Sequence, residues 1–120
     1  GSVRQGDGQM TEYEKIIEAV KSFGYPYAPD IYTGNKERYF VYNYADERGD
    51  LYADNLPGTV IASVQVHFYL PADENFIRIK NQIRDALFRQ GFTFPEVTVL
   101  REGKKRHIVF ECDIEEEMED

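Results

Sequence analysis

The change of hydrophobic period within residues 59–91 constrains the fold more than any other feature of the sequence. Up to Leu70, apolar side chains alternate with mostly polar ones, which predicts a long strand with one buried face. The apolar positions are Val60, Ala62, Val64, Val66, Phe68 and Leu70. Residues 71–74 break this pattern and are expected to supply a cap, after which apolar residues recur at helical spacing until Gly91 ends the helix. These are Phe76, Ile79, Ile83, Ala86 and Leu87.

Another helix is predicted near the N-terminus, where Thr11 and Glu14 have the spacing of a capping box. Its apolar stripe consists of Tyr13, Ile16, Ile17 and Val20, and Gly24 is its expected stop. Prolines 26 and 29 cannot continue a helix, because each lacks an amide hydrogen and favours extended geometry before it. We therefore expect an extended connection there, with a short strand near residues 31–33.

The remaining strands are predicted from residue type and from turns. Residues 38–44 are rich in aromatic and β-branched side chains, and residues 45–50 are expected to form a polar turn. Residues 97–101 and 106–114 flank a turn at residues 102–105, which predicts an antiparallel hairpin. The simplest fold is α+β, with a mainly antiparallel sheet of four to five strands and two helices packed on one face. The other face would carry Tyr, His, Gln and Thr side chains.

Length and composition indicate one domain. A chain of 120 residues, 42% of them apolar, can fill one core, and we expect that domain to span residues 10–114. Residues 1–9 lack periodicity and precede Met10, so we interpret them as an expression remnant, and residues 115–120 are predicted to be a disordered acidic tail. No apolar stretch approaches the roughly 20 residues of a membrane span, and the single Cys112 excludes an internal disulfide. Both observations favour a cytoplasmic protein.

The net charge of −8 is unevenly distributed along the chain. Residues 10–71 hold five basic and nine acidic side chains, residues 72–110 hold eight basic and five acidic ones, and residues 111–120 hold seven acidic ones. Opposite charges on different edges of one domain would favour head-to-tail association of copies, although a simple solvated surface is the commoner meaning of such runs. An overall acidic chain is a poor candidate for sequence-specific binding of nucleic acid.

The only two histidines, His67 and His107, both fall at outward positions of predicted strands. A pair on neighbouring strands is therefore conceivable, with Asp113 or Glu111 nearby, but ordinary hydrogen-bonded surface histidines are the favoured interpretation. The sequence contains no zinc-binding or calcium-binding motif and no glycine-rich phosphate loop. We predict no catalytic residue, no metal site and no cofactor.

The order of these patterns resembles small tail-completion or tail-terminator proteins of long-tailed bacteriophages and prophages. The resemblance is carried by RYFVYNYADERGDLYADNLPGTVIASVQVHFYLPADENFIRIKNQIRDALFRQGF and by VTVLREGKKRHIVFECDIE, and it covers nearly all of residues 10–114. The matching marks include an acidic turn with Asp54-Asn55 after the aromatic strand, a proline-containing break before a helix that ends in Gly-Phe, and a hairpin with a histidine just after its turn. None of these marks is a catalytic signature.

The resemblance implies a structural protein without enzymatic activity, which assembles as a ring of copies, expected to be a hexamer. The ring would end the tail tube and join it to the head connector, first in the bacterial cytoplasm and then in the virion tail. A ring requires two different faces that bind each other. We expect the interface to join basic residues of the hairpin to acidic residues of a neighbour; the candidates are Arg101, Lys104, Lys105 and Arg106 on one side and Asp46, Glu47 and Asp50 on the other.

Two alternatives remain open at this point. The first is a small cytoplasmic adaptor or inhibitor, whose acidic surface binds a basic partner. The second is an enzyme that uses His67 and His107.

Overall fold

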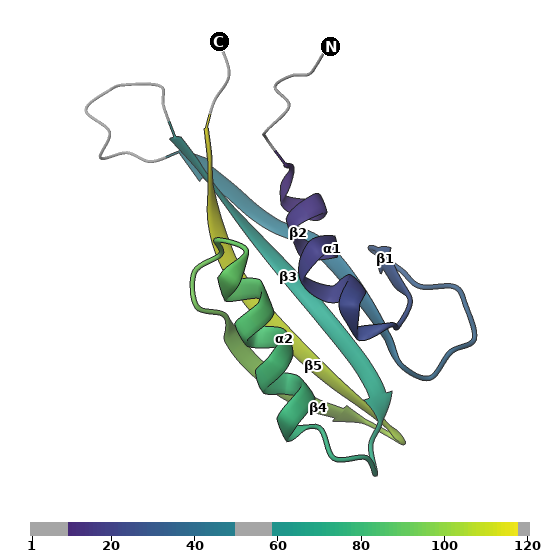
Figure 1. The fold of residues 1–120 in the computed structure, drawn as a ribbon. Helices are drawn as coiled ribbons and strands as arrows, with labels where there is room; N and C mark the ends of the chain where they lie inside the picture. The colour runs from purple at the N-terminus through teal and green to yellow at the C-terminus, as the bar shows by residue number, and fades with distance from the viewer. Residues whose placement is uncertain (1–9, 50–58, 118–120) are drawn as a thin grey trace.

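The computed structural model describes residues 10–49 and 59–117, which form a five-stranded sheet and two α-helices (Figure 1). In chain order the elements are α1 (Glu12–Val20), the 3-10 helix η1 (Lys21–Phe23), β1 (Tyr27–Pro29), β2 (Tyr39–Gly49), β3 (Thr59–Pro71), α2 (Ile77–Arg89), β4 (Glu96–Glu102) and β5 (Lys105–Glu117). The strand order is β1-β2-β3-β5-β4, and only the β1–β2 pair is parallel. The predicted α+β class with a mainly antiparallel sheet is confirmed.

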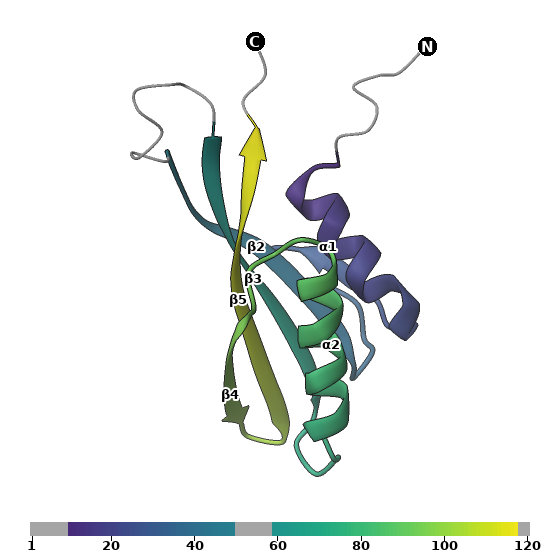
Figure 2. The same ribbon diagram turned by 60° about the vertical axis from the view of Figure 1, so that its left-hand side comes forward.

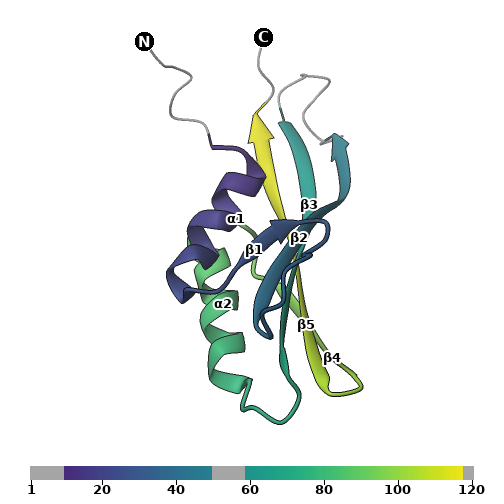
Figure 3. The same cartoon turned by 90° about the vertical axis from the view of Figure 1, so that its right-hand side faces the viewer.

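Both helices lie on the same face of the sheet, as the turned views show (Figures 2 and 3). The core fills the space between the helices and the inner face of the three interior strands, β2, β3 and β5. The alternation of β3 is confirmed, because Val64, Val66 and Phe68 are at most 1% exposed. From α2, Ile83 and Leu87 are fully buried against them. None of the described helices has the length and apolar character needed to cross a membrane.

The predicted start of α1 is confirmed by its cap. The amide of Glu14 donates to the Thr11 hydroxyl at 3.2 Å, and the Glu14 carboxylate accepts from the Thr11 amide at 2.8 Å. The helix continues through η1 and ends at Gly24, whose φ of 85° lies in the left-handed region that suits glycine. The capping box and the glycine stop therefore predicted both ends of this helix correctly.

Several predicted boundaries differ from the structure. The short strand is β1, and not residues 31–33, because Tyr27 to Pro29 pair with the start of β2. Residues 45–49 continue β2 instead of turning, with a bulge at Ala45, because residues 46–49 pair with residues 60–63 of β3. β5 continues through Glu117, so the first residues of the predicted disordered tail pair with β3. The predicted remnant at residues 1–9 and the tail residues 118–120 lie outside the described residues.

The start of α2 also differs from its prediction. The helix begins at Ile77, whose amide donates to the Asn75 side chain at 3.0 Å, and its first turn contains no acidic residue. Glu74, which was expected to contribute to the cap, forms an ion pair with Arg38 instead, with 3.0 Å between Arg38 Nε and Glu74 Oε1. This pair ties the connection between β3 and α2 to the residue that precedes β2.

Candidate functional site on the open face of the sheet

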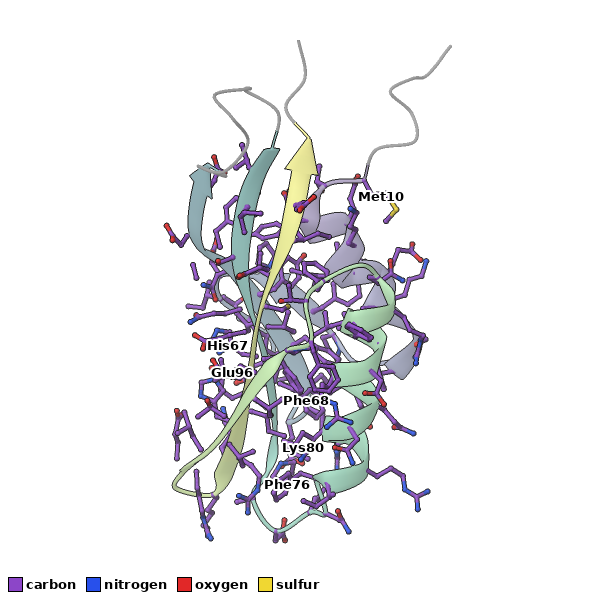
Figure 4. The ribbon with its side chains drawn as sticks, turned by 90° about the vertical axis from the view of Figure 1, so that its left-hand side faces the viewer. Met10, His67, Phe68, Phe76, Lys80 and Glu96 are labelled. Carbon is purple, nitrogen blue, oxygen red and sulfur yellow. The ribbon has the colours of Figure 1, made fainter. Side chains whose placement is uncertain are left out.

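The face of the sheet opposite the helices, here called the open face, carries the polar and aromatic side chains that sequence alternation placed there. His67 points away from α2 in Figure 4, whereas its neighbour Phe68 points toward the helix layer. The register places the side chains of Asn43, His67, His107 and Glu102 on four neighbouring strands, β2, β3, β5 and β4. This juxtaposition creates a connected polar cluster across the open face.

The two histidines contact each other directly, as the sequence allowed. His67 Nδ1 lies 2.7 Å from His107 Nε2, and the other ring nitrogen of His107, Nδ1, lies 3.0 Å from Oε2 of Glu102. His67 Nε2 lies 2.9 Å from Oδ1 of Asn43. Every ring nitrogen of the pair therefore has a hydrogen-bond partner, although His107 is only 9% exposed.

The hydrogen-bond chain continues from Asn43 on β2 through β3 to β5. Asn43 Nδ2 donates to Gln65 Oε1 at 3.3 Å, and Gln65 Nε2 donates to Oε2 of Glu111 at 2.8 Å. A carboxylate thus stands at each end, Glu102 on β4 and Glu111 on β5, with the histidines between them. The chain crosses four strands, and its hydrogen bonds hold the orientation of the two rings.

A stack of aromatic rings runs beside this polar chain. The ring centroids are 4.3 Å apart for Tyr32–Tyr39, 4.7 Å for Tyr39–Tyr69 and 4.3 Å for Tyr69–His107. Lys105 donates to the Tyr39 hydroxyl at 2.9 Å and lies over the rings of Tyr39 and Tyr69. The stack connects the histidine pair to the loop that contains Tyr32.

The electrostatics of the cluster keep His67 from taking up a proton easily. Burial lowers the pKa of His67, and the neighbouring His107 lowers it further, against opposing effects of Glu111 and Glu102. Burial also raises the pKa of Tyr69, so this phenol stays neutral beside the pair. His67 is therefore a neutral imidazole at physiological pH.

Of the two carboxylates expected near the histidines, Glu111 belongs to their hydrogen-bond chain, but the carboxylate that contacts the pair directly is a different one. Glu102, and not Asp113, is bonded to the pair, while Asp113 accepts from the Ser63 hydroxyl at 2.6 Å and Glu111 reaches His67 only through Gln65 and Asn43. Alternation along β2 and β3 could have indicated Asn43 and Tyr69. The contact of Glu102 with His107 could not be predicted, because the sequence pattern places residue 102 in the hairpin turn and not at the end of β4.

The candidate interface residues lie at opposite ends of the sheet. Asp46 and Glu47 are exposed near the end of β2, at the top of Figure 1, whereas Arg101, Lys104 and Lys105 are exposed at the β4–β5 hairpin at the bottom. Arg106 is directed inward: its guanidinium lies over Phe76 and donates to the Ala72 carbonyl oxygen at 3.1 Å. Asp50 lies outside the described residues.

A groove of about 610 Å³ lies beside the basic hairpin. One wall is the loop with Tyr32 and Lys36, and the other is the hairpin with Lys104 and Lys105. No group of three or more His, Cys, Asp and Glu among the described residues is arranged to hold a metal ion.

The comparisons with known proteins do not assign a family. No protein-family model matches the chain, and no curated protein matches it.

Proposed function

We propose that the protein is a structural tail-assembly component of a long-tailed phage or prophage, and that it acts by binding neighbouring copies of itself. In this proposal the copies close into a ring that ends the tail tube and docks to the head connector. The order of sequence patterns described above motivates the phage assignment. The separation of charge along the sheet supports head-to-tail self-association.

The supporting observation is the distance between the acidic and basic ends of one chain. On β3, the register partner of Glu47 is Ala62 and that of Lys105 is Pro71. These partners are nine strand residues apart, which corresponds to about 30 Å. Within one chain the two ends therefore cannot pair, because that distance exceeds the Debye length of about 8 Å at physiological salt. A second copy can bring them together.

The groove at the hairpin offers a place for the acidic end of a neighbour. Its lining contains three lysines, Lys36 from the loop and Lys104 and Lys105 from the hairpin, beside two glutamates. Lys36 was not among the residues expected from the sequence. Exposed charges of this kind contribute mainly to orientation and association rate, so the interaction should weaken as salt increases.

The test is the molar mass of the full chain, measured by light scattering over a range of salt concentrations. We expect Lys104→Glu combined with Lys105→Glu to reduce the oligomer to monomers at low salt. Glu47→Lys should do the same. Mixing the two variants should restore assembly, because each supplies the charge that the other lost.

Arg89→Glu is the matched control, because Arg89 is exposed at the end of α2, away from the hairpin. It should leave the molar mass unchanged. Negative-stain images of the wild-type oligomer should show closed rings. A wild-type chain that stays monomeric at every concentration and salt, yet binds a basic protein, would replace this proposal with the adaptor hypothesis.

A further inference from the structure

We propose that His67 and His107 form one proton-binding site, which holds one proton more than two neutral imidazole rings at neutral pH. The argument for this site does not rest on the self-association proposed above, although Glu102 also lines the groove at the hairpin. It follows from the direction of each hydrogen bond in the chain that crosses the open face, and each direction can be assigned from a group whose role is unambiguous.

One end of the chain is fixed by Asn43. Its amide nitrogen lies 3.0 Å from the carbonyl oxygen of Tyr44, which can only accept a hydrogen bond, so this atom is the NH₂ group. The side-chain oxygen of Asn43 must then be the atom 2.9 Å from His67 Nε2. Because that oxygen can only accept, His67 Nε2 must carry a hydrogen.

The other end is fixed by Glu102. A carboxylate oxygen can only accept a hydrogen bond. His107 Nδ1, which lies 3.0 Å from Oε2 of Glu102, must therefore also carry a hydrogen. The remaining contact, 2.7 Å between His67 Nδ1 and His107 Nε2, requires one further hydrogen between the two rings.

The count gives the charge of the pair. Three hydrogen bonds require three N–H groups, whereas two neutral imidazoles supply only two. With only two N–H groups on the pair, two acceptor atoms would face each other within hydrogen-bond distance. With four, two N–H groups would point at each other across 2.7 Å. With Glu102 as a carboxylate, only the singly protonated pair satisfies the whole chain.

The third hydrogen lies in the contact between the two rings, and we place it on His107 Nε2 because burial lowers the pKa of His67 and so opposes a charge on that ring. The groups that face the pair are Glu102 from β4, Glu111 from β5 through Gln65, and the neutral phenol of Tyr69 from β3. The nearest cation along the stack is Lys105, whose ammonium lies over Tyr39 and Tyr69. One carboxylate therefore contacts the pair directly, and a second lies at the other end of the chain.

The consequence is a pH-sensitive link across four strands. Loss of the shared proton leaves one hydrogen bond of the chain without a donor, and gain of a second proton forces the two rings apart. Since His107 stacks on Tyr69, a rearrangement of the pair also moves the aromatic stack that ends at the Tyr32 loop.

The test is a long-range ¹H–¹⁵N spectrum of the imidazole nitrogens in the full chain at pH 7.5. A free imidazole is protonated about one time in ten at this pH. We expect His67 to show the neutral form with hydrogen on Nε2, and His107 to show the imidazolium form. The same chain in urea should show two neutral rings. Two neutral rings in the folded chain would overturn the proposal, and this result needs no variant.

A matched pair of variants tests the part played by Glu102. Glu102→Gln keeps an acceptor oxygen but removes the charge, and we expect the imidazolium signals to disappear at lower pH than in the wild type. Glu96→Gln makes the same change on the same strand, at an exposed residue opposite Glu111, and should leave the titration unchanged. An unaltered titration in Glu102→Gln would show that the proton is not held by this carboxylate and would refute the assigned chain.

Discussion

Tyr44 of β2 donates its phenolic O–H to Oε1 of Glu12 in α1, with 2.5 Å between the two oxygens. Glu12 is only 6% exposed, although it belongs to the first turn of a surface helix. The contact joins α1 to β2 immediately before the bulge at Ala45. It therefore positions the helix against the strand section that carries Asp46 and Glu47.

Removing this hydroxyl should loosen α1. We expect Tyr44→Phe to lower the free energy of unfolding by about 1.5 kcal/mol, at the low end for a bond to a charged acceptor because Tyr44 is 45% exposed. Urea denaturation monitored by circular dichroism measures the difference. Tyr27→Phe, at a phenol of similar exposure (40%) on β1, is the control and should have little effect. Equal losses in the two variants would contradict the assigned role of Tyr44.

The capping box of α1 leads to a second prediction. Thr11→Ala removes the hydroxyl that accepts from the Glu14 amide, and should cost about 1 kcal/mol of stability. Ser22→Ala, in the exposed 3-10 turn at the other end of the helix, is the comparison. Thermal unfolding of both variants gives the measurement, and an unchanged melting temperature for Thr11→Ala would argue against the cap.

How far the sequence could specify this fold depends on how local each signal is. The cap at Thr11 and the alternation of Val64, Val66 and Phe68 are local patterns, and both were predicted correctly. Residues 45–49 have the composition of a turn, but pairing with β3 makes them a strand. Turn propensity is weak compared with a ladder of backbone hydrogen bonds between two long strands.

The candidate site needed information that no local pattern contains. His67 and His107 could be placed on outward faces, but their contact depends on the register, in which His67 pairs with Val109 and Tyr69 pairs with His107. Glu102 reaches the pair only because β4 continues through the residue that was assigned to the turn. Register is set by long-range packing of the buried face, so a sequence read alone gives the face of each side chain but not its neighbours.

Two phenylalanines of equal size should respond very differently to truncation. Phe110 of β5 is fully buried, whereas Phe94, before β4, is 59% exposed against Phe88 and Arg84. We expect Phe110→Ala to cost about 3–5 kcal/mol through lost burial and a cavity, and Phe94→Ala to cost less than about 1 kcal/mol. Urea midpoints at constant slope measure both. Similar losses would mean that the core does not lie where β3 and β5 place it.

Cys112 should be chemically inert in the folded protein. Its side chain is 4% exposed, and burial, with a smaller effect of Asp113, raises the pKa of its thiol to about 12. Since the thiolate is the reactive species, we expect a disulfide reagent at pH 8 to react at least about 100-fold more slowly than with the urea-unfolded chain. The rate at which the same reagent reacts with glutathione, with and without urea, corrects for the effect of urea on the reagent itself. A fast reaction of the folded chain would contradict the burial of β5.

The lowered pKa of His67 also predicts how stability depends on pH. Because burial and His107 hold the pKa of the folded state below the ordinary value of 6.5, the unfolded chain binds a proton more readily than the folded one as pH falls. The stabilising contribution of neutral His67 is thus fully present above about pH 6.5 and is lost progressively below it. The slope from this residue cannot exceed about 1.4 kcal/mol per pH unit. Subtracting the urea-unfolding free energies of His67→Gln from those of the wild type gives the pH dependence that depends on His67, including its contact with His107, since the acid-titrating groups away from the pair are common to both chains. We expect the wild type to lose more stability than His67→Gln between pH 6.5 and pH 5, and parallel curves would mean that His67 binds protons equally in both states.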